Sequence, residues 1–345
     1  MSIYEALRAR ALPVLPETRE EMLTVLQQEE YGFVPPPPLQ LQFEAEPPRP
    51  FAAGKATLQK VRLQCTLPGG TCSFPIYAAI PHKAVPCPAF VLINFSSAVP
   101  DPYYPAEEIL DRGYAVFSFF HGDVTTDDPD MENNLAGAIL GGKPRDDAAP
   151  GKIALWAWAA MRTLDYALTL QCIDSSRIAV VGHSRLGKTA LLAGALDERF
   201  SLVISNDSGC GGAALFRGKV GERIEQITNR FPFWFCPRFR QYAGREEALP
   251  FDQHFLLSAI APRALYVASA QEDTWADPTS EYLGCVAAAP AFERFGKDFI
   301  HPDGFPRTGQ PLHEGRIGYH RRAGTHYLSR EDWNLFMDFF DCQRA

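Results

Sequence analysis

A serine between two glycines is the residue of this sequence best placed to act as a nucleophile. Ser184 lies in the segment Gly-His-Ser-Arg-Leu-Gly at 182–187, after the β-branched, apolar run 177–181 and before residues 189–196, which are good helix formers. This order predicts a buried strand, a sharp turn and a helix, the arrangement called a nucleophile elbow. The spacing is Gly-x-Ser-x-x-Gly instead of the usual Gly-x-Ser-x-Gly, and the alternative is a glycine-flanked turn with a surface serine.

A nucleophilic serine needs a histidine base and an acid that orients it, and chain order restricts both. In hydrolases with such an elbow the order is nucleophile, acid, histidine. Of the five histidines after Ser184, His326 stands directly before the last predicted helix, the position expected for the base. The others are expected to pack at a helix start or to lie in loop-rich sequence without a clear partner: His254, His301, His313 and His320.

Two aspartates compete for the role of the acid. Asp207 follows an apolar strand at 202–206, and Asp273 follows another at 264–270. Either carboxylate can hold His326 in the tautomer that accepts the serine proton. We expect Asp273 to be the acid, because the later strand is its usual place and Trp275 two residues on suggests a loop that lines a site.

The elements around these residues alternate between strands and helices, which predicts an α/β fold with a doubly wound, mostly parallel sheet. Near-continuous apolar runs, typical of parallel strands covered on both faces, lie at 89–95 and 114–120. Two alternating runs at 57–66 and 72–80, joined by Pro-Gly-Gly at 68–70, predict an antiparallel hairpin. Helices are expected at 17–30, 106–112, 153–170, 189–196 and 330–340.

The whole chain, 1–345, is expected to form one domain with an N-terminal helical extension at about 1–38, which ends in four prolines at 35–38. Residues 122–150 are acidic and glycine-rich, which predicts a long irregular loop. Its carboxylates are expected to be solvated, with cation binding as the alternative: Asp123, Asp127, Asp128 and Asp130.

Composition excludes several classes of function. The net charge is −8 without a long basic run, which argues against nucleic acid and anionic membranes as partners. No stretch reaches the roughly 18–20 apolar residues of a membrane span, and the first ten residues contain no apolar signal core. We therefore expect a cytoplasmic protein, with secretion as the alternative if a signal peptide has been removed. None of the eight cysteines forms a Cys-x-x-Cys pair, so no zinc site is expected. We expect small buried thiols, with disulfides as the alternative in an oxidising compartment.

The elbow and the segments beyond it resemble the glucuronoyl esterases, whose elbow reads Gly-Cys-Ser-Arg-x-Gly-Lys. The corresponding block here is Gly-His-Ser-Arg-Leu-Gly-Lys at 182–188. The likeness covers roughly residues 20–340 in one order. Its other segments are Tyr31-Gly32, 121–123, 206–214, Gly221-Glu222, 233–235, 249–254, 260–263, 273–278 and 324–326.

The resemblance implies an α/β-hydrolase fold, a three-layer sandwich, and hydrolysis of the ester between a 4-O-methyl-glucuronic acid group on xylan and a lignin alcohol. It implies that Ser184 is the nucleophile and His326 its general base and acid. It further implies that Arg185 donates to the oxyanion from its backbone N–H and guanidinium. The implied sugar contacts are Lys188 and Glu222, which bond hydroxyl groups, and Trp275, which forms an aromatic wall.

Two residues depart from the family pattern. His183 replaces the cysteine before the nucleophile, and we expect it to alter packing only, because that side chain points away from an elbow nucleophile. Asp207 is shorter than the glutamate often found at its position. The mechanism needs no cofactor or metal, and a cytoplasmic member would act on imported glucuronoyl oligosaccharide esters.

Two other functions remain open. A deacetylase of acetylated xylo-oligosaccharides would use Ser184 and His326 without a role for Glu222. A non-catalytic sugar-binding protein of the hydrolase fold is the alternative from a different class, and the ordered serine, acid and histidine argue against it.

Overall fold

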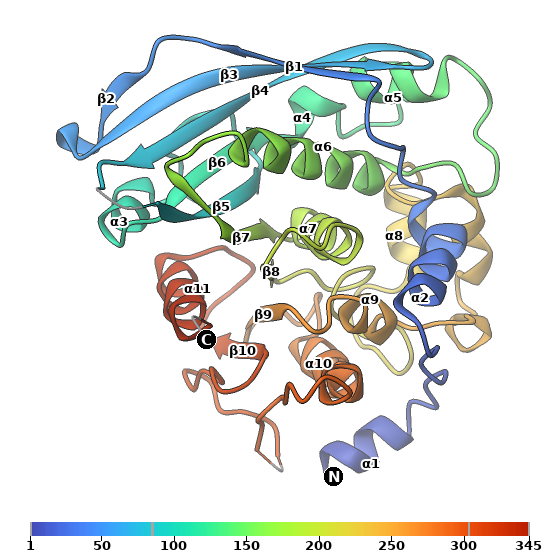
Figure 1. Cartoon of the computed structure of the whole chain (residues 1–345). Helices are drawn as coiled ribbons and strands as arrows, with labels where there is room; N and C mark the ends of the chain where they lie inside the picture. Colours follow the sequence, from blue (N-terminus) through green and yellow to red (C-terminus); the bar gives the residue numbers. More distant parts are fainter. Residues whose placement is uncertain (1, 84–85, 303, 344–345) are drawn as a thin grey trace.

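One large sheet runs through the molecule, with helices on both of its faces (Figure 1). The computed structural model describes residues 2–83, 86–302 and 304–343. Within these residues ten strands form a sheet in the order β1-β3-β4-β6-β5-β7-β8-β9-β10, and β2 pairs with β3. Along this order, each pairing from β1 through β3 and β4 to β6 is antiparallel, and so is that of β2 with β3. Each pairing from β6 through β5, β7, β8 and β9 to β10 is parallel. The predicted doubly wound, mostly parallel sheet is therefore confirmed.

The strands are β1 Gln40–Ala45, β2 Arg49–Phe51, β3 Ala56–Leu67, β4 Gly70–Pro81, β5 Cys87–Asn94, β6 Ala115–Phe120, β7 Ile173–His183, β8 Leu202–Asn206, β9 Ala264–Ala270 and β10 Ile317–Arg322. The α-helices are α1 Ile3–Arg8, α2 Arg19–Leu26, α3 Ala106–Asp111, α4 His121–Val124, α5 Asn134–Leu140, α6 Lys152–Ala167, α7 Arg185–Leu196, α8 Ile224–Arg230, α9 His254–Ser258, α10 Pro278–Glu293 and α11 Arg330–Cys342.

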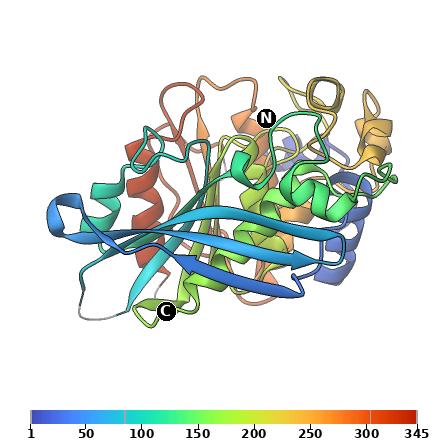
Figure 2. The ribbon, with the colours of Figure 1, turned by 90° about the horizontal axis from the view of Figure 1, so that it is seen from above.

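The predicted antiparallel hairpin is the pair β3 and β4. Pro68 and Gly69 make its turn, and Leu67 pairs with Gly70. Burial alternates along much of both strands, as expected of a sheet with one face on the core and one toward solvent. Seen from above, the hairpin and β1 sweep across one side of the molecule (Figure 2).

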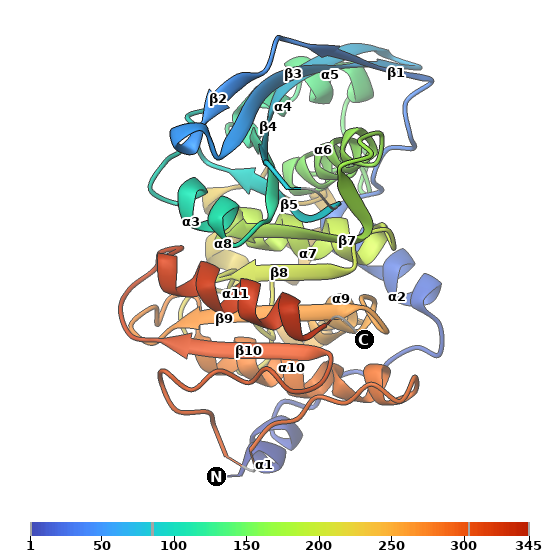
Figure 3. The ribbon, with the colours of Figure 1, turned by 60° about the vertical axis from the view of Figure 1, so that its left-hand side comes forward.

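The parallel strands are buried because helices cover both of their faces. Helices α3 and α11 pack on one face, where Ile109, Trp333 and Phe336 join the core. On the other face lie α6, α7, α9 and α10, with Trp156 and Leu191 among their buried side chains. Figure 3 shows α11 in front of β8, β9 and β10 with α7, α9 and α10 behind them. This makes the three layers that the resemblance implied.

Several elements differ from the prediction. Strand β10 and helix α10 were not predicted, and α4 and α5 interrupt the loop expected at 122–150. The helix expected at 17–30 is α2, which ends at Leu26 and continues as a π-helical turn, Gln27–Tyr31. Helix α7 begins at Arg185, four residues earlier than predicted, so the elbow serine directly precedes the helix.

Helices α1 and α2 of the predicted N-terminal extension pack against α10 and α9, and Ile3 and Leu26 belong to the main core. No helix in the described part of the chain is both long and apolar enough to cross a membrane. All eight cysteines are free thiols, and six of them are buried; Cys172 and Cys342 are exposed.

Close packing of α7 on β8 yields a test of the fold. A Cβ atom at Gly194 would lie 2.1 Å from Cγ2 of Val203. In an exposed helix, replacing glycine with alanine stabilises by about 1 kcal/mol. Here the overlap should reverse the sign, and we expect Gly194→Ala to lower the free energy of unfolding by about 1–3 kcal/mol. Urea denaturation measures this change. Gly304→Ala, at an open loop position, is the control and should leave stability unchanged or slightly higher.

Candidate active site

Ser184 occupies a strained turn between β7 and α7. Its backbone has φ 57° and ψ −126°, a conformation that non-glycine residues rarely adopt. The turn is possible because Gly182 has no side chain: a Cβ there would lie 2.1 Å from the carbonyl oxygen of Leu186. The N–H groups of Gly187 and Lys188 donate to the carbonyl of Ser184 at 2.9 and 3.2 Å. Those of Arg185 and Leu186, the first two of α7, have no acceptor one turn earlier in the helix, so they are available beside the serine. The predicted elbow is present.

The other predicted residues sit on loops that follow β8, β9 and β10. Asp207 comes directly after β8, Asp273 lies three residues after β9, and His326 lies between β10 and α11. Backbone hydrogen bonds join the last two loops: the N–H of Gln271 donates to Arg322, and that of Glu272 donates to Gly324. Parallel pairing therefore gathers all of these side chains at one edge of the sheet.

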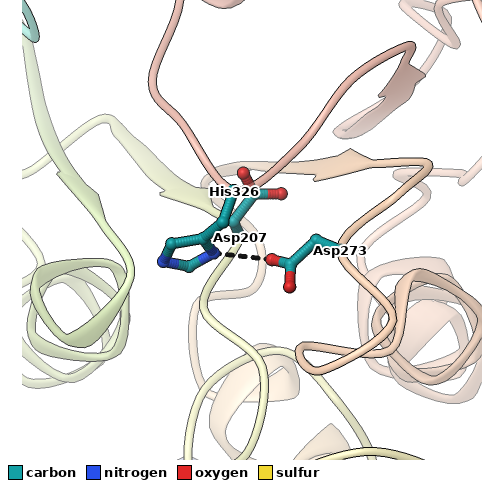
Figure 4. Close-up of side chains that lie close together, drawn as sticks. All are labelled: Asp207, Asp273 and His326. Carbon is teal, nitrogen blue, oxygen red and sulfur yellow. Dashed lines mark hydrogen bonds and ion pairs between the residues drawn. The ribbon is translucent and has the colours of Figure 1, made fainter.

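His326 and Asp273 are joined directly by a hydrogen bond. The imidazole Nδ1 donates to the Asp273 carboxylate at 2.6 Å (Figure 4). The aspartate side chain is 5% exposed and that of the histidine 43%. Burial opposes ionisation of Asp273, yet the hydrogen bond and the charge of His326 lower its pKa. The carboxylate is thus suited to hold Nδ1–H and to leave Nε2 free as a base.

Asp207 lies beside the same imidazole without a hydrogen bond to it (Figure 4). Its oxygens accept from the backbone N–H groups of Ala270 at 2.7 Å and Tyr327 at 3.3 Å, and from Arg322 at 3.4 Å. Burial and the neighbouring carboxylates of Glu281 and Asp273 raise the pKa of Asp207. Its contacts tie β8 to the loops of β9 and β10, so it connects the elements that present His326.

A single cavity of about 310 Å³ contains every residue that the sequence predicted for the site. Its walls include the serine, histidine, both aspartates and Arg185, together with the three predicted sugar contacts: Lys188, Glu222 and Trp275. Other lining residues were not predicted: Ser208, Gly209, Arg230, Phe231, Trp234 and Ala276. The volume is at the lower end of the roughly 300–1,000 Å³ typical of small-molecule sites.

The three predicted sugar contacts come from separate segments of the chain. Lys188 and Glu222 are buried and not solvated at the surface, and Trp275 is exposed and not part of the core. Lys188, one turn into α7, is buried and donates to the carbonyl of Ser208. Burial lowers its pKa, and the charge of Glu222 opposes that shift. Glu222 is 8% exposed, and its N–H donates to the carbonyl of Trp275 at 3.0 Å. Trp275 lines the cavity and is 51% exposed.

Arg185 is held by a residue that the sequence analysis placed in a solvated loop. Its guanidinium pairs with Asp127, and that carboxylate also accepts from Trp234 Nε1 at 2.6 Å. The guanidinium carbon lies 4.8 Å from the centre of the Trp234 ring and 5.8 Å from that of Phe231. Asp127 is therefore part of the site. No spacing pattern distinguishes it from the other aspartates of its loop.

His183 is a packing residue, as expected, and one of its packing partners is the histidine of the site. Its ring centre lies 4.5 Å from that of His326, and only 3% of the residue is exposed. The prediction considered the direction of the side chain relative to Ser184 alone. It missed that the loop of His326 folds back over the end of β7.

The remaining histidines lie outside the cavity, and two of them are better partnered than predicted. His320 lies in β10 and donates from Nε2 to Asp332 at 2.7 Å, while its Nδ1 contacts the Tyr266 hydroxyl at 2.9 Å. The same hydroxyl lies 2.9 Å from His313. The prediction that these residues have no clear partner is wrong. His254 begins α9 and is buried, as predicted.

A serine elbow, a histidine and an acid at the carboxyl edge of a doubly wound sheet define the α/β-hydrolase class. A family model for fungal glucuronyl esterases matches residues 63–296. Carbohydrate esterase MZ0003, from an unknown prokaryotic organism, is 41% identical over 68% of this chain and 55% of its own. The 4-O-methyl-glucuronoyl methylesterase of Podospora anserina is 30% identical over 79% and 54% of the two chains.

Solved structures extend the comparison. The glucuronoyl esterase from Solibacter usitatus superposes with a TM-score of 0.88 at 32% identity and covers 95% of this chain and 93% of that one. The chain belongs to the glucuronoyl esterase family. It spans about half the length of the two curated relatives described above.

The geometry separates the two aspartates, and activity should follow it. Asp273→Asn leaves His326 without an ionised partner, and loss of such an acid can cost about 10⁴ in kcat. Asp207→Asn keeps that pair and replaces one accepting oxygen with a donor that faces N–H groups. We expect it to cost less activity and to lower the free energy of unfolding by about 1–3 kcal/mol.

Steady-state ester hydrolysis and urea denaturation of both variants measure the two effects. A larger loss of kcat in Asp207→Asn than in Asp273→Asn, with both proteins folded, would assign the acid to the earlier strand.

Proposed function

We propose that this protein is a serine carboxylic ester hydrolase that cleaves esters of glucuronic acid or 4-O-methyl-glucuronic acid from xylan-derived saccharides. One observation carries the proposal. Lys188, Glu222 and Trp275 surround the same cavity as Ser184, His326 and Asp273. A cation and a carboxylate match the hydroxyl groups of a sugar, and an exposed indole matches the apolar face of a pyranose ring. The name of the Podospora anserina relative agrees with this substrate class.

In the proposed reaction His326 Nε2 takes the hydroxyl proton while Ser184 Oγ bonds to the ester carbonyl carbon. The carbonyl oxygen becomes an oxyanion, which the N–H at the start of α7 and the Arg185 guanidinium stabilise. Preorganised donors of this kind contribute about 2.7–4 kcal/mol each to transition-state binding. The bond to the alcohol oxygen then breaks, and His326 protonates that oxygen. Water attacks the acyl-enzyme in a second, equivalent step that returns the proton and frees the uronic acid.

The cavity limits what part of a substrate it can enclose. About 310 Å³ suits one uronate ring and a small part of the alcohol, so a longer saccharide must extend outside. A uronate ester carries no charge at its reacting carboxyl, so the cation of Arg185 serves the oxyanion and not the ground state. This is the differential binding that accelerates the chemical step.

Comparison of two substrates tests the proposal. We expect methyl or benzyl glucuronate esters to be hydrolysed with a higher kcat/KM than an acetylated xyloside. Ser184→Ala and His326→Ala should each lower the rate by several orders of magnitude, and the double variant should be little worse, because the two residues act as one unit. Preference for the acetylated xyloside would support a deacetylase. Sugar binding without ester hydrolysis would support a binding protein.

The predicted sugar contacts give a sharper test of specificity. Lys188→Ala and Glu222→Ala should lower kcat/KM for a glucuronate ester much more than for a small aryl acetate, because each removes a sugar contact and leaves the reacting groups in place. We expect a difference of about 10-fold or more, the equivalent of one charged hydrogen bond of roughly 1.5–3 kcal/mol. Equal losses on both substrates would show that these buried residues support the fold instead.

A further inference from the structure

The ring of His183 packs against the histidine that acts as the base. His183 is the last residue of β7, immediately before Ser184. The ring centres of His183 and His326 are 4.5 Å apart and the planes are inclined by 44°. The nucleophile and the residue that packs against its base are therefore neighbours in sequence, at the end of β7.

His183 is itself fixed from several directions. Its Nδ1 lies 2.6 Å from the side-chain oxygen of Asn206, its register partner on β8. An amide oxygen only accepts, so Nδ1 carries the proton. The ring stacks on Tyr103 at 5.4 Å with an angle of 27°, and Phe95 meets it edge-on at 6.1 Å. These contacts fix the orientation of the His183 ring.

His326 depends on a fixed neighbouring ring, because the residues of its own loop do not bury its imidazole. The side chain is 43% exposed, and the Asp273 bond holds only its Nδ1 edge. One hydrogen bond leaves the tilt of the ring about that contact undetermined. A ring face packed against it removes this freedom and directs Nε2. Misplacement of a catalytic group by about 1 Å can cost about 10² in rate.

The neutral state of the His183 ring is also compatible with a contact to His326. Burial and the neighbouring charge of His326 lower the pKa of His183 to about 3, although Asn206 opposes this shift. The ring therefore stays neutral at the pH of catalysis. It neither competes for the Asp273 carboxylate nor repels the imidazolium that forms on His326 when the serine loses its proton.

We propose that His183 is a positioning residue for the ester hydrolysis described above: its ring is the wall that orients the imidazole of His326 toward Ser184. This inference rests on the proposed function only in requiring that Ser184 and His326 react with an ester. It does not require that the ester be a glucuronate.

Three variants separate the ring of His183 from its hydrogen bond. His183→Ala removes both. His183→Gln keeps a donor for Asn206 and removes the ring, while His183→Phe keeps a ring and loses the donor. His254→Ala is the matched control, because His254 is equally buried at 3%, has a pKa lowered by burial to about 4 and bonds only to the carbonyl of Pro13 among the described residues.

We expect kcat of His183→Ala and His183→Gln to fall about 10- to 100-fold, with KM changed by less than about two-fold, because orientation acts on the chemical step. His183→Phe should stay within about five-fold of the original kcat even where its melting temperature falls, since the ring contact that positions the base is kept. His254→Ala should lose stability and keep kcat. If His183→Ala does not fold, the pair His183→Gln and His183→Phe decides.

The measurements use a benzyl glucuronate ester and an aryl acetate in parallel. Activity on the acetate alone would overturn the proposed function and still test this inference. The rate at which a fluorophosphonate labels Ser184, followed by intact mass, provides a readout without any ester and should fall in the same two variants. The inference is overturned if folded His183→Ala and His183→Gln keep kcat and labelling rate, or if His183→Phe loses as much as His183→Gln.

Discussion

Parallel pairing of β7, β8, β9 and β10 is the constraint on which the rest of the site depends. His183 pairs with Asn206, Asn206 with Ala268, and Ala270 with Arg322. These registers end neighbouring strands at nearly the same height, so the residues that follow them project from one edge. A slip of one residue would move each side chain to the opposite face of the sheet. Both faces are closely packed against helices, so such a slip would exchange side chains of different size and shape and disrupt the packing.

A buried network of charges holds the loops that this pairing brings together. Arg322 at the end of β10 donates to Asp332 at 2.9 Å and to Asp207 at 3.4 Å. The same guanidinium bonds the carbonyls of Thr325 and Tyr327, the two neighbours of His326. Asp332 caps the start of α11 through Ser329. Buried charges are costly unless they are paired. Loss of Arg322 or of Asp332 would therefore destabilise the loop that carries His326.

Much of the parallel core was predictable, because strands buried on both faces are continuous apolar runs. Strand β10 was not, since Ile-Gly-Tyr-His-Arg-Arg at 317–322 looks too polar for a buried strand. His320 and Arg322 are nevertheless buried, because Asp332 on α11 bonds both of them and Tyr266 on β9 contacts His320. Helix α10 was not predicted, because it is buried on nearly all sides and therefore lacks an amphipathic pattern. In addition, Pro290 within it is unfavourable for a helix.

Among the residues of the site, too, those with a local sequence pattern were predicted and those defined by long-range contacts were not. Ser184 was found because a strand, a glycine-flanked turn and a helix follow one another in the sequence, and Lys188 because its block resembles the elbow of the glucuronoyl esterases. Asp127 was missed because its partner Arg185 lies far away in sequence, and an acid in an acidic loop resembles its neighbours until the loop is placed. His183 was recognised as a departure, but its contact with His326 joins the end of β7 to the loop after β10, and these segments meet only in the folded chain.

Proximity alone does not assign roles to the acids around His326. Asp207, Asp273 and His326 each offer a ligand atom within 4.8 Å of the others, yet the two carboxylates differ in what remains available on them. Both oxygens of Asp207 are engaged by donors that belong to the scaffold. One oxygen of Asp273 accepts from Ala276 at 3.2 Å, which leaves the other for the imidazole. The carboxylate with an unclaimed oxygen orients the base. The carboxylate of Asp207, with donors on both of its oxygens, connects the loops that follow β8, β9 and β10.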